Sequence, residues 1–311
     1  MEKVYDVLIL GAGPAGLTAG LYAGRSGLSA GILEQGQDGG QIANTMAVEN
    51  YPGQCLDGES GTSLAARMAA QAEQFGAARI QDTIQAAELQ GQIKRLTGLQ
   101  GEYLARAVII ATGASPRPIG CKNEAEFVGK GLSYCATCDG PLFRNRAVYV
   151  VGGGDAAVEE AVYLAKFARE VTVIHRRDRL RAAKSIQERA FQHPRIRFLW
   201  DTVVEAVDGD GVLSAMTVRN TKTGERRSIA ASPADGLFGL FGYVGLLPNT
   251  ALFQGVLNLE NGYLVTDGRM KTNLPGVFAA GDVRAKSLRQ VVTATADGAI
   301  AAVEAEKYLH G

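Results

Sequence analysis

The chain has 311 residues, more than one hydrophobic core usually organises, so two domains are expected. Hydrophobic residues make up 46% and charged residues 21% of the sequence, a composition typical of a soluble globular protein. Basic and acidic residues balance at 32 each, which argues against a nucleic-acid-binding protein, because such proteins usually carry a net positive field.

The first predicted elements are a strand, a glycine-rich turn and a helix. Residues 4–10 form an apolar run typical of a strand, and residues 14–25 are predicted as a helix, since proline is tolerated in a first turn. Residues 28–33 form the next predicted strand, which ends at Glu34. The uncharged run 7–24 could suggest a signal peptide or a membrane helix, but its glycines and proline favour the turn. The sequence therefore predicts a cytoplasmic protein that does not cross a membrane.

The same pattern returns further along the chain. Residues 107–113 are predicted as a strand that leads into a turn. Residues 147–151 form a second apolar strand, residues 156–168 a helix, and residues 171–174 a strand that ends at His175. The chain thus contains an internal repeat of strand, turn and helix, which indicates a parallel α/β architecture.

The last predicted elements are a short apolar run at 276–282 and a helix over residues 289–308. Segments rich in turn residues lie at 115–118 and 242–248, and they mark two domain boundaries.

The first glycine motif has the context that dinucleotide binding requires. Gly11, Gly13 and Gly16 follow a predicted strand and open a predicted helix. The first glycine permits the tight turn, the second lets backbone approach a pyrophosphate, and the third allows close packing of helix and strand. Glu34 lies 23 positions after Gly11 at the end of the next strand, where a carboxylate can accept hydrogen bonds from ribose hydroxyls.

The second glycine motif repeats this arrangement with a different ending. Gly152 and Gly154 occupy the first two glycine positions and Ala157 the third. At the offset where the first motif has its acid, the second has His175 followed by a basic cluster: Arg176, Arg177 and Arg181. Guanidinium groups can hold a 2′-phosphate bidentately, so this motif favours NADPH over NADH, whereas the first fits a ligand such as FAD.

Glycine-rich turns also occur in α/β proteins that bind no nucleotide, and the arginines could be a solvated surface. Two motifs with matched offsets favour binding. The sequence therefore predicts an α/β protein of two Rossmann-like, three-layer nucleotide-binding domains, the second inserted into the first. The first domain comprises residues 1–114 and 248–311 and binds FAD; the second comprises residues 115–247 and binds NADPH.

Cys135 and Cys138 form a Cys-x-x-Cys pair inside the predicted second domain. This spacing permits an easily exchanged disulfide and can lower the pKa of one thiol. A structural zinc site needs two more ligands at suitable spacing, and the remaining cysteines, Cys55 and Cys121, stand alone, so no metal is expected. Cys55 and Cys121 are interpreted as packed thiols.

Asp139 directly follows the cysteine pair and has two interpretations. It is a common turn residue before Gly140 and Pro141, and it could equally serve as an acid–base group for thiols that gain and lose protons. The spacing alone does not choose between them.

Over essentially its whole length the sequence resembles bacterial low-molecular-weight thioredoxin reductases. The segments that carry the resemblance are GAGPAG (11–16), GGQ (39–41), ENYPG (49–53), ATGA (111–114), CATCDG (135–140), GGGDAAVEE (152–160), HRRDRLR (175–181), GVFAAGD (276–282) and Arg289-Gln290.

The resemblance implies a role for each matched position. Cys138 would be the thiol nearest the flavin, Cys135 the thiol that attacks the disulfide of a thioredoxin or thioredoxin-like protein, and Asp139 the proton donor. The implied NADPH residues are Gly152, Gly154, His175, Arg176, Arg177 and Arg181. The implied FAD residues are Gly11, Gly13, Gly16, Glu34, Gly40, Gln41, Asn50, Thr112, Gly113, Asp282, Arg289, Gln290 and Val291.

The resemblance also implies a homodimer whose NADPH domain rotates, so that the cysteine pair alternates between flavin and partner protein. The two segments near 115–118 and 242–248 would be the connectors. The family usually has a Gly-x-x-Pro-Asn-Thr turn at the second connector, and counted from Gly242 this turn is three residues longer here, which puts the hinge geometry in doubt.

Three other functions compete with this prediction. The flavoprotein partner of a peroxiredoxin carries a further N-terminal Cys-x-x-Cys, and this sequence has one such motif. A ferredoxin-fed relative lacks the basic cluster that is present here. A redox-inert nucleotide-binding protein would need no Cys-x-x-Cys at all.

Overall fold

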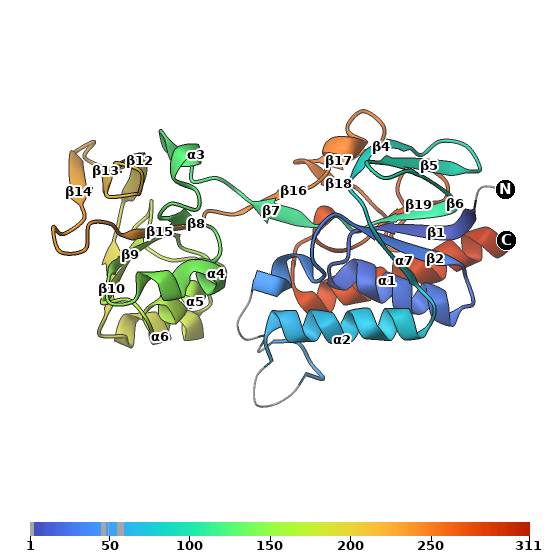
Figure 1. The fold of residues 1–311 in the computed structure, drawn as a ribbon, viewed down its shortest axis with the longest axis horizontal. Helices are drawn as coiled ribbons and strands as arrows, with labels where there is room; N and C mark the ends of the chain where they lie inside the picture. The colour runs from blue at the N-terminus through green and yellow to red at the C-terminus, as the bar shows by residue number, and fades with distance from the viewer. Residues whose placement is uncertain (1–2, 45–47, 49, 55–58) are drawn as a thin grey trace. The chain divides into compact units, whose positions relative to one another are not determined.

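A computed structural model describes residues 3–44, 48, 50–54 and 59–311 (Figure 1). The chain forms two compact units. The first contains residues 1–115 and 247–311, and the second contains residues 116–246. Both units combine helices with largely parallel sheets, so the α/β prediction is confirmed.

A seven-stranded sheet forms the centre of the first unit. Its parallel part consists of neighbouring apolar strands, and an antiparallel hairpin extends it at one edge. In spatial order the strands are β3 (Ala78–Gln81), β2 (Ala30–Glu34), β1 (Val4–Leu10), β6 (Glu102–Ile110), β5 (Lys94–Gly98) and β4 (Ile84–Glu88), with β19 (Val277–Ala279) also paired to β6.

Strand β6 connects the early and late parts of this sheet. Its beginning pairs antiparallel with β5, through Glu102 to Ala105. Its end, Val108–Ile110, pairs in parallel with β19, which comes almost 170 positions later in the sequence. The first unit is therefore complete only when its C-terminal segment has joined the N-terminal strands.

Three helices cover one face of this sheet (Figure 1). They are α1 (Pro14–Arg25), α2 (Gly61–Gln74) and α7 (Val291–His310). Helices α1 and α7 approach each other closely because Gly298 has no side chain. A Cβ atom at Gly298 would lie 2.1 Å from the carbonyl oxygen of Ala15. Smaller elements complete the unit: the 3₁₀ turns η1 (Gly40–Asn44), η3 (Ala251–Phe253) and η4 (Gly281–Val283), and the strands β17 (Leu259–Glu260) and β18 (Tyr263–Leu264).

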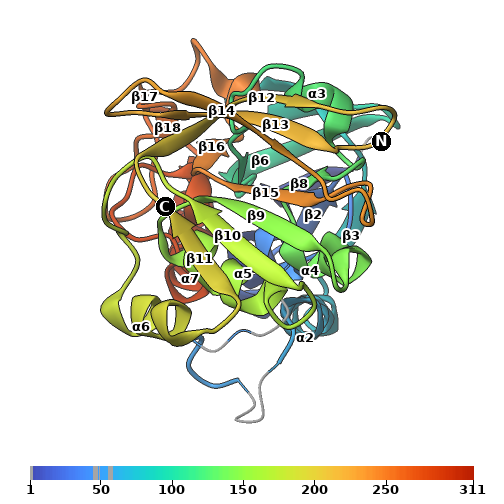
Figure 2. The same ribbon diagram turned by 90° about the vertical axis from the view of Figure 1, so that its left-hand side faces the viewer.

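The second unit contains a five-stranded sheet in which every pairing is parallel. Its strands in spatial order are β11 (Ile196–Leu199), β10 (Glu170–Ile174), β9 (Ala147–Gly152), β15 (Gly239–Tyr243) and β8 (Leu132–Ser133). Helices α4 (Ala136–Asp139), α5 (Asp155–Leu164) and α6 (Lys184–Gln192) lie on one face (Figure 2).

The other side of that sheet carries a small antiparallel sheet (Figure 2). It consists of β12 (Thr202–Asp208), β13 (Ala215–Asn220) and β14 (Arg226–Ala230), with the short helix α3 (Glu124–Phe127) and the turn η2 (Gly140–Phe143) completing the unit. Leu213, Met216 and Val218 are buried with Leu240 of β15 in the core beneath these strands.

The two connectors pair with each other as a two-stranded ladder, β7 (Ala114–Pro116) with β16 (Leu246–Pro248). The structure corrects the interpretation of the second connector. Gly242 lies inside β15, and the turn is made at Gly245, whose φ is +124°. The family pattern is therefore met by Gly245-Leu-Leu-Pro248-Asn-Thr250, and the connector has its usual length.

No helix in the described parts of the chain is both long enough and apolar enough to cross a membrane.

Candidate nucleotide and redox sites

The first glycine turn has no room for side chains on its protein side. Gly11 has φ +103°, and a Cβ there would lie 2.4 Å from the carbonyl oxygen of Ala111. A Cβ at Gly16 would lie 1.8 Å from the carbonyl oxygen of Gly11. Gly13, the residue that caps α1, would meet nothing within 4 Å. The outer side of the turn is thus open at the position where backbone has to approach a phosphate, and this geometry fits a dinucleotide.

Glu34 closes this turn from the neighbouring strand. One carboxylate oxygen accepts a hydrogen bond from the Ala12 amide at 2.8 Å, and the other accepts one from the Gly36 amide at 2.9 Å. A carboxylate has further lone pairs, so these two bonds orient Glu34 and leave acceptor capacity for ribose hydroxyls. The acid predicted from its offset thus lies beside the glycine motif.

The segment around η1 lies against the same turn. The amide of Gly39 donates to the carbonyl of Ala12 at 2.8 Å, and a Cβ on Gly40 would be 3.5 Å from the Cα of Gly13. Gln41 follows and is exposed. The structure therefore brings Gly40 and Gln41 to the open side of the first glycine motif.

Asn50 and Gln290 lie together although 240 positions separate them. The Asn50 side-chain amide donates to the side-chain oxygen of Gln290 at 3.0 Å. Gln290 caps helix α7 in a capping box with Thr293, and Val291 is the first residue of the helix. The guanidinium group of Arg289 lies 3.9 Å from the centre of the Tyr263 ring.

Asp282 is half-buried, and its buried Oδ1 atom has no hydrogen-bond partner in the described chain. Burial raises the pKa of Asp282, although Lys286 Nζ lies 3.6 Å from its carboxylate. A buried acceptor without a partner is costly, so this oxygen is suited to a hydroxyl donor from a ligand. Asp282 lies on η4 directly after β19, at the sheet edge where β1 and β6 also end.

Thr112 and Gly113 follow β6 at this edge. The Thr112 hydroxyl donates to the Asn249 carbonyl, and the Asn249 side chain donates to the Thr112 carbonyl, both at 2.8 Å. Gly113 has φ +64°, which turns the chain into β7. Sequence reasoning overlooked Asn249, although it lies in the Pro-Asn-Thr turn that had been noted for its length.

Sequence reasoning also overlooked a buried charge network next to Asp282. Asp297 of α7 accepts from Arg284 at 2.8 Å and from Lys286 at 3.0 Å, and it accepts the amide of Gly281 at 3.0 Å. Arg284 and Lys286 lie within four positions of Asp282, so a charge count around that residue could have revealed the network.

The second glycine turn is built in the same way. A Cβ at Gly152 would lie 2.5 Å from the carbonyl oxygen of Tyr243 and 2.6 Å from the Cβ of Ala157. Gly154 caps α5 and has nothing within 4 Å of its Cβ position. Ala157 is buried at the position where the first motif has a glycine. This turn too is closed on its protein side and open on its outer side, as a dinucleotide requires.

The His175 ring packs against that turn at Gly153. Its ring lies 2.3 Å from where a Cβ of Gly153 would be, and only 6% of the residue is exposed. Burial lowers the pKa of His175, so the ring is held in its neutral form, and its Nε2 atom has no hydrogen-bond partner in the described residues.

The arginine cluster is exposed next to the second turn. The amide of Arg181 donates to the Gly153 carbonyl at 2.6 Å, which folds the cluster back towards the glycines. Within the described chain, no ion pair or hydrogen bond engages the guanidinium groups of Arg176, Arg177 and Arg181. Three exposed cations without anionic partners fit a phosphate ligand.

Cys135 and Cys138 form a disulfide with an S–S distance of 2.09 Å. Cys135 caps helix α4, and its sulfur accepts the Cys138 amide at 3.1 Å. Cys135 is half-buried and Cys138 is exposed. Asp139 is half-buried, and its amide donates to the Cys135 carbonyl at 3.2 Å, so its backbone belongs to the same turn.

The other cysteines are not part of this site. Cys121 is a buried free thiol, and burial raises its pKa to about 11, which makes it unreactive at neutral pH. The interpretation of Cys121 as a packed thiol is confirmed, whereas Cys55 lies outside the described residues. No group of three or more metal-ligating side chains occurs among the residues that the structure describes.

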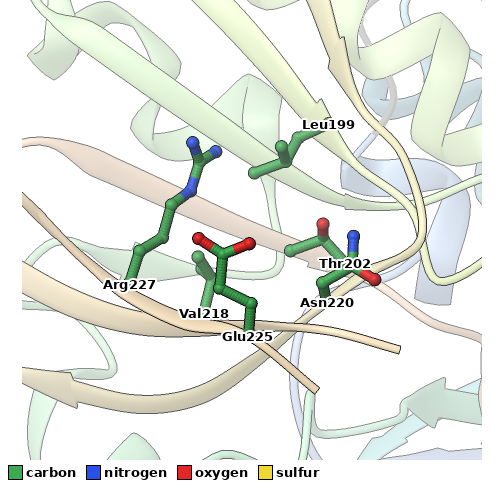
Figure 3. A pocket seen from close by; sticks show the side chains of 6 residues that line it. All are labelled: Leu199, Thr202, Val218, Asn220, Glu225 and Arg227. Carbon is green, nitrogen blue, oxygen red and sulfur yellow. The ribbon is translucent and has the colours of Figure 1, made fainter. Parts of the chain in front are cut away.

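A cavity of about 140 Å³ lies at the strands of the second unit's antiparallel sheet (Figure 3). Its lining residues are Leu199, Thr202, Val218, Asn220, Glu225 and Arg227. Ligand pockets usually measure about 300–1,000 Å³. This cavity is smaller and contains none of the predicted site residues, so it is not a nucleotide site.

Known proteins of one family match this chain over almost its whole length. The pyridine nucleotide-disulphide oxidoreductase family matches residues 5–298. The chain is 54% identical over 310 residues to a thioredoxin reductase of Peptoclostridium litorale, with 99% of this chain and 98% of that protein covered. It is 46% identical over 311 residues to a thioredoxin reductase of Bacillus subtilis, with 99% and 96% covered.

Among solved structures, the FR conformation of Lactococcus lactis thioredoxin reductase matches with a TM-score of 0.93 and 43% identity, covering 98% of this chain and 99% of that chain. The predicted fold of two Rossmann-like domains is thereby confirmed. The chain belongs to the pyridine nucleotide-disulphide oxidoreductases and, within them, to the thioredoxin reductases, which are FAD flavoenzymes that use NADPH.

Proposed function

We propose that this protein transfers electrons from NADPH, through FAD, to the disulfide of a thioredoxin or thioredoxin-like protein. The observation that carries the proposal is the Cys135–Cys138 disulfide, which lies in the same unit as the second glycine turn and its exposed arginines. A redox-inert nucleotide-binding protein would have no use for such a pair.

We assign FAD to the first unit, residues 1–115 and 247–311, and NADPH to the second, residues 116–246. The buried oxygen of Asp282, which no hydrogen bond engages in the described chain, and the carboxylate of Glu34 suit hydroxyl groups of the flavin's ribityl chain and ribose. The three exposed arginines suit the 2′-phosphate that distinguishes NADPH from NADH. His175 would hold the glycine turn in place by packing against Gly153.

FAD held by the first unit would supply the redox chemistry that carries an electron pair from NADPH to the disulfide. Breaking the S–S bond with two electrons and two protons gives two thiols. We assign Asp139 as the proton donor because its backbone is part of the cysteine turn. We assign Cys138, the exposed member of the pair, to the flavin side.

Cys135 would then attack the partner's disulfide as a thiolate. This forms a mixed disulfide and releases one partner thiol, after which Cys138 displaces the second. The partner leaves as a dithiol and the Cys135–Cys138 disulfide forms again. The cysteine turn must therefore meet two different reaction partners.

We further propose a cytoplasmic homodimer whose second unit rotates about the paired connectors β7 and β16. A crosslink that fixes the connectors should abolish turnover and still permit a single reduction of the flavin. Undiminished turnover would exclude the rotation, and a monomeric mass in light scattering would exclude the dimer.

An anaerobic titration with NADPH tests the central proposal. We expect NADPH to bleach the flavin of the purified holoenzyme, and the reduced enzyme to reduce thioredoxin in an insulin assay. The Cys135→Ser, Cys138→Ser double variant should still be bleached and should reduce no thioredoxin. Bleaching by reduced ferredoxin but not by NADPH would show that the donor assignment is wrong.

A further inference from the structure

Tyr243 at the end of β15 contacts the cysteine turn directly. Its hydroxyl oxygen accepts a hydrogen bond from the amide of Ala136 at 2.8 Å. Ala136 is the first residue of α4, lies between Cys135 and Cys138, and is 1% exposed. The first N–H groups of a helix have no acceptor within the helix. Tyr243 therefore supplies the acceptor that this buried amide would otherwise lack.

The preceding residue, Gly242, has no side chain and therefore leaves space for the Tyr134 ring. A Cβ at Gly242 would lie 2.6 Å from the ring of Tyr134, the residue before Cys135, and 2.9 Å from the side chain of Ile119. The end of β15 thus contacts the chain on both sides of Cys135: Tyr134 packs over Gly242, and Ala136 is bound by Tyr243.

The environment keeps the Tyr243 phenol neutral. Burial raises its pKa well above the ordinary value, and Glu160 and Asp139 act in the same direction. Since the hydroxyl does not ionise at working pH, its hydrogen bond to Ala136 is available in every redox state of the cysteines.

We propose that Tyr243 is a positioning residue that sets the redox potential of the Cys135–Cys138 pair. The proposal rests on the assigned redox role of this pair and adds a residue to which neither the glycine motifs nor the family segments point. Tyr243 acts through the backbone of α4, by its hydrogen bond to the Ala136 amide.

The two redox states depend on this hydrogen bond to different degrees. With the disulfide formed, the turn cannot open, so losing the Tyr243 hydroxyl leaves the buried Ala136 amide without a partner. With the disulfide reduced, the turn can open and water can solvate the amide. The hydrogen bond thus stabilises the disulfide more than the dithiol, and it makes the dithiol a stronger reductant.

Equilibration of the holoenzyme with glutathione tests this proposal. Two glutathione molecules supply two electrons and two protons, the cysteine disulfide becomes a dithiol, and glutathione disulfide forms. After alkylation, mass spectrometry of the peptide that contains both cysteines gives the oxidised fraction. In Tyr243→Phe we expect the equilibrium to shift about 5-fold towards the dithiol, which corresponds to a potential about 20 mV higher.

Tyr149→Phe is the matched control. Tyr149 lies on the neighbouring strand β9, opposite Leu240 of β15, and no hydrogen bond links its hydroxyl to the described cysteine turn. We expect its equilibrium to stay within 2-fold of the wild type. A Tyr243→Phe equilibrium within that same range, or an equal shift in both variants, would overturn the proposal.

Hydrogen exchange of the wild-type protein adds a test that needs no variant. The Ala136 amide should exchange slowly in the disulfide form, where Tyr243 binds it and the turn cannot open, and faster in the dithiol form, where the turn can open. Rapid exchange in the disulfide form, or equal exchange in both forms, would refute the proposal. Neither measurement involves NADPH or thioredoxin, so an error in the proposed donor or partner would leave both results interpretable.

Discussion

Gly13 and Gly16 lie one helical turn apart, and a methyl group should act differently at the two positions. Gly13→Ala meets open space in an allowed conformation, with φ −73°, so the apoprotein should keep its stability and lose affinity for FAD. Gly16→Ala would press on the Gly11 carbonyl and should cost about 3 kcal/mol or more of unfolding free energy. Thermal melts of the apoproteins and FAD titrations separate the two effects. An equal decrease of the melting temperature in both variants would contradict the predicted difference.

The choice of NADPH should depend on the exposed guanidinium groups. In the proposed NADPH site, Arg177→Gln would remove a charge-assisted contact to the 2′-phosphate, so KM for NADPH should rise about 10- to 100-fold while KM for NADH changes little. Arg197→Gln, an exposed arginine on β11, is the control and should alter neither. An equal change in KM for NADPH and NADH in Arg177→Gln would show that this arginine does not bind the 2′-phosphate.

The carboxyl group of Asp282 should make the stability of the apoprotein depend on pH. Burial raises the pKa of this carboxyl in the folded protein above its ordinary value of 3.8. The folded apoprotein therefore loses stability as pH rises through the interval between the ordinary and the raised value, because the charged form is disfavoured by burial. Above that interval the loss is complete.

Asp282→Asn should remove this loss. The variant apoprotein should melt higher than the wild type at pH 7, with a difference that shrinks towards pH 4, and it should bind FAD less tightly. Asp210→Asn, in an exposed loop, should show neither change. A lower melting temperature of the Asp282→Asn apoprotein at pH 7 would contradict the assigned cost of burial.

At the scale of elements, one carboxylate joins three strands of the second unit. Glu205 of β12 pairs with Arg219 of β13 at 2.5 Å and with Arg226 of β14 at 2.6 Å. Hydrogen bonds from Arg226 and Arg219 lower the pKa of Glu205 to about 2. The stability that these pairs add is present above pH 4.5 and is lost as pH falls from 4.5 towards 2.

Glu205→Gln should therefore lower the melting temperature at pH 7, and the difference from the wild type should vanish at the acid end of this range. High salt should reduce it as well, because the pairs are partly exposed. Glu225→Gln, an exposed residue before β14, is the control. A difference that stays constant from pH 7 to the acid end would show that the ion pairs are not its cause.

Elements with strong local signals were predicted closely. Strand β1 and helix α1 have the predicted bounds, because an apolar run, a glycine turn and Pro14 mark them within a few residues. Strand β2 begins at Ala30, two positions later than predicted, and α5 ends at Leu164 instead of Ala168, where a turn follows. Helix α7 starts at Val291 because Gln290 is its cap.

The antiparallel strands were not predicted, since their residues carry little local pattern. Strand β14, for example, is mostly exposed and contains two arginines. It forms a strand because it pairs with β13, and its own residues do not indicate this. The site shows the same division. Motif spacing predicted Glu34 and the arginines as site residues, but Tyr243 contacts Ala136, 107 positions away in the sequence, which spacing cannot reveal.

At the scale of the whole molecule, the second unit should fold by itself. Residues 116–246 are continuous in sequence and contain two apolar clusters of their own, around Val150 and around Leu240. A fragment of these residues should unfold cooperatively and bind NADPH more tightly than NADH. A fragment without cooperative unfolding would mean that the first unit is required for its stability.

Strand β19 and helix α7 are synthesised after the whole inserted unit. Since these elements complete the first sheet and pack on α1, the N-terminal 115 residues would stay incompletely folded while the inserted unit leaves the ribosome and folds. The nascent chain would thus acquire its nicotinamide nucleotide site before its flavin site. Flavin binding would be the last step of maturation. A shortage of flavin would leave chains whose second unit is folded and whose first unit has no cofactor.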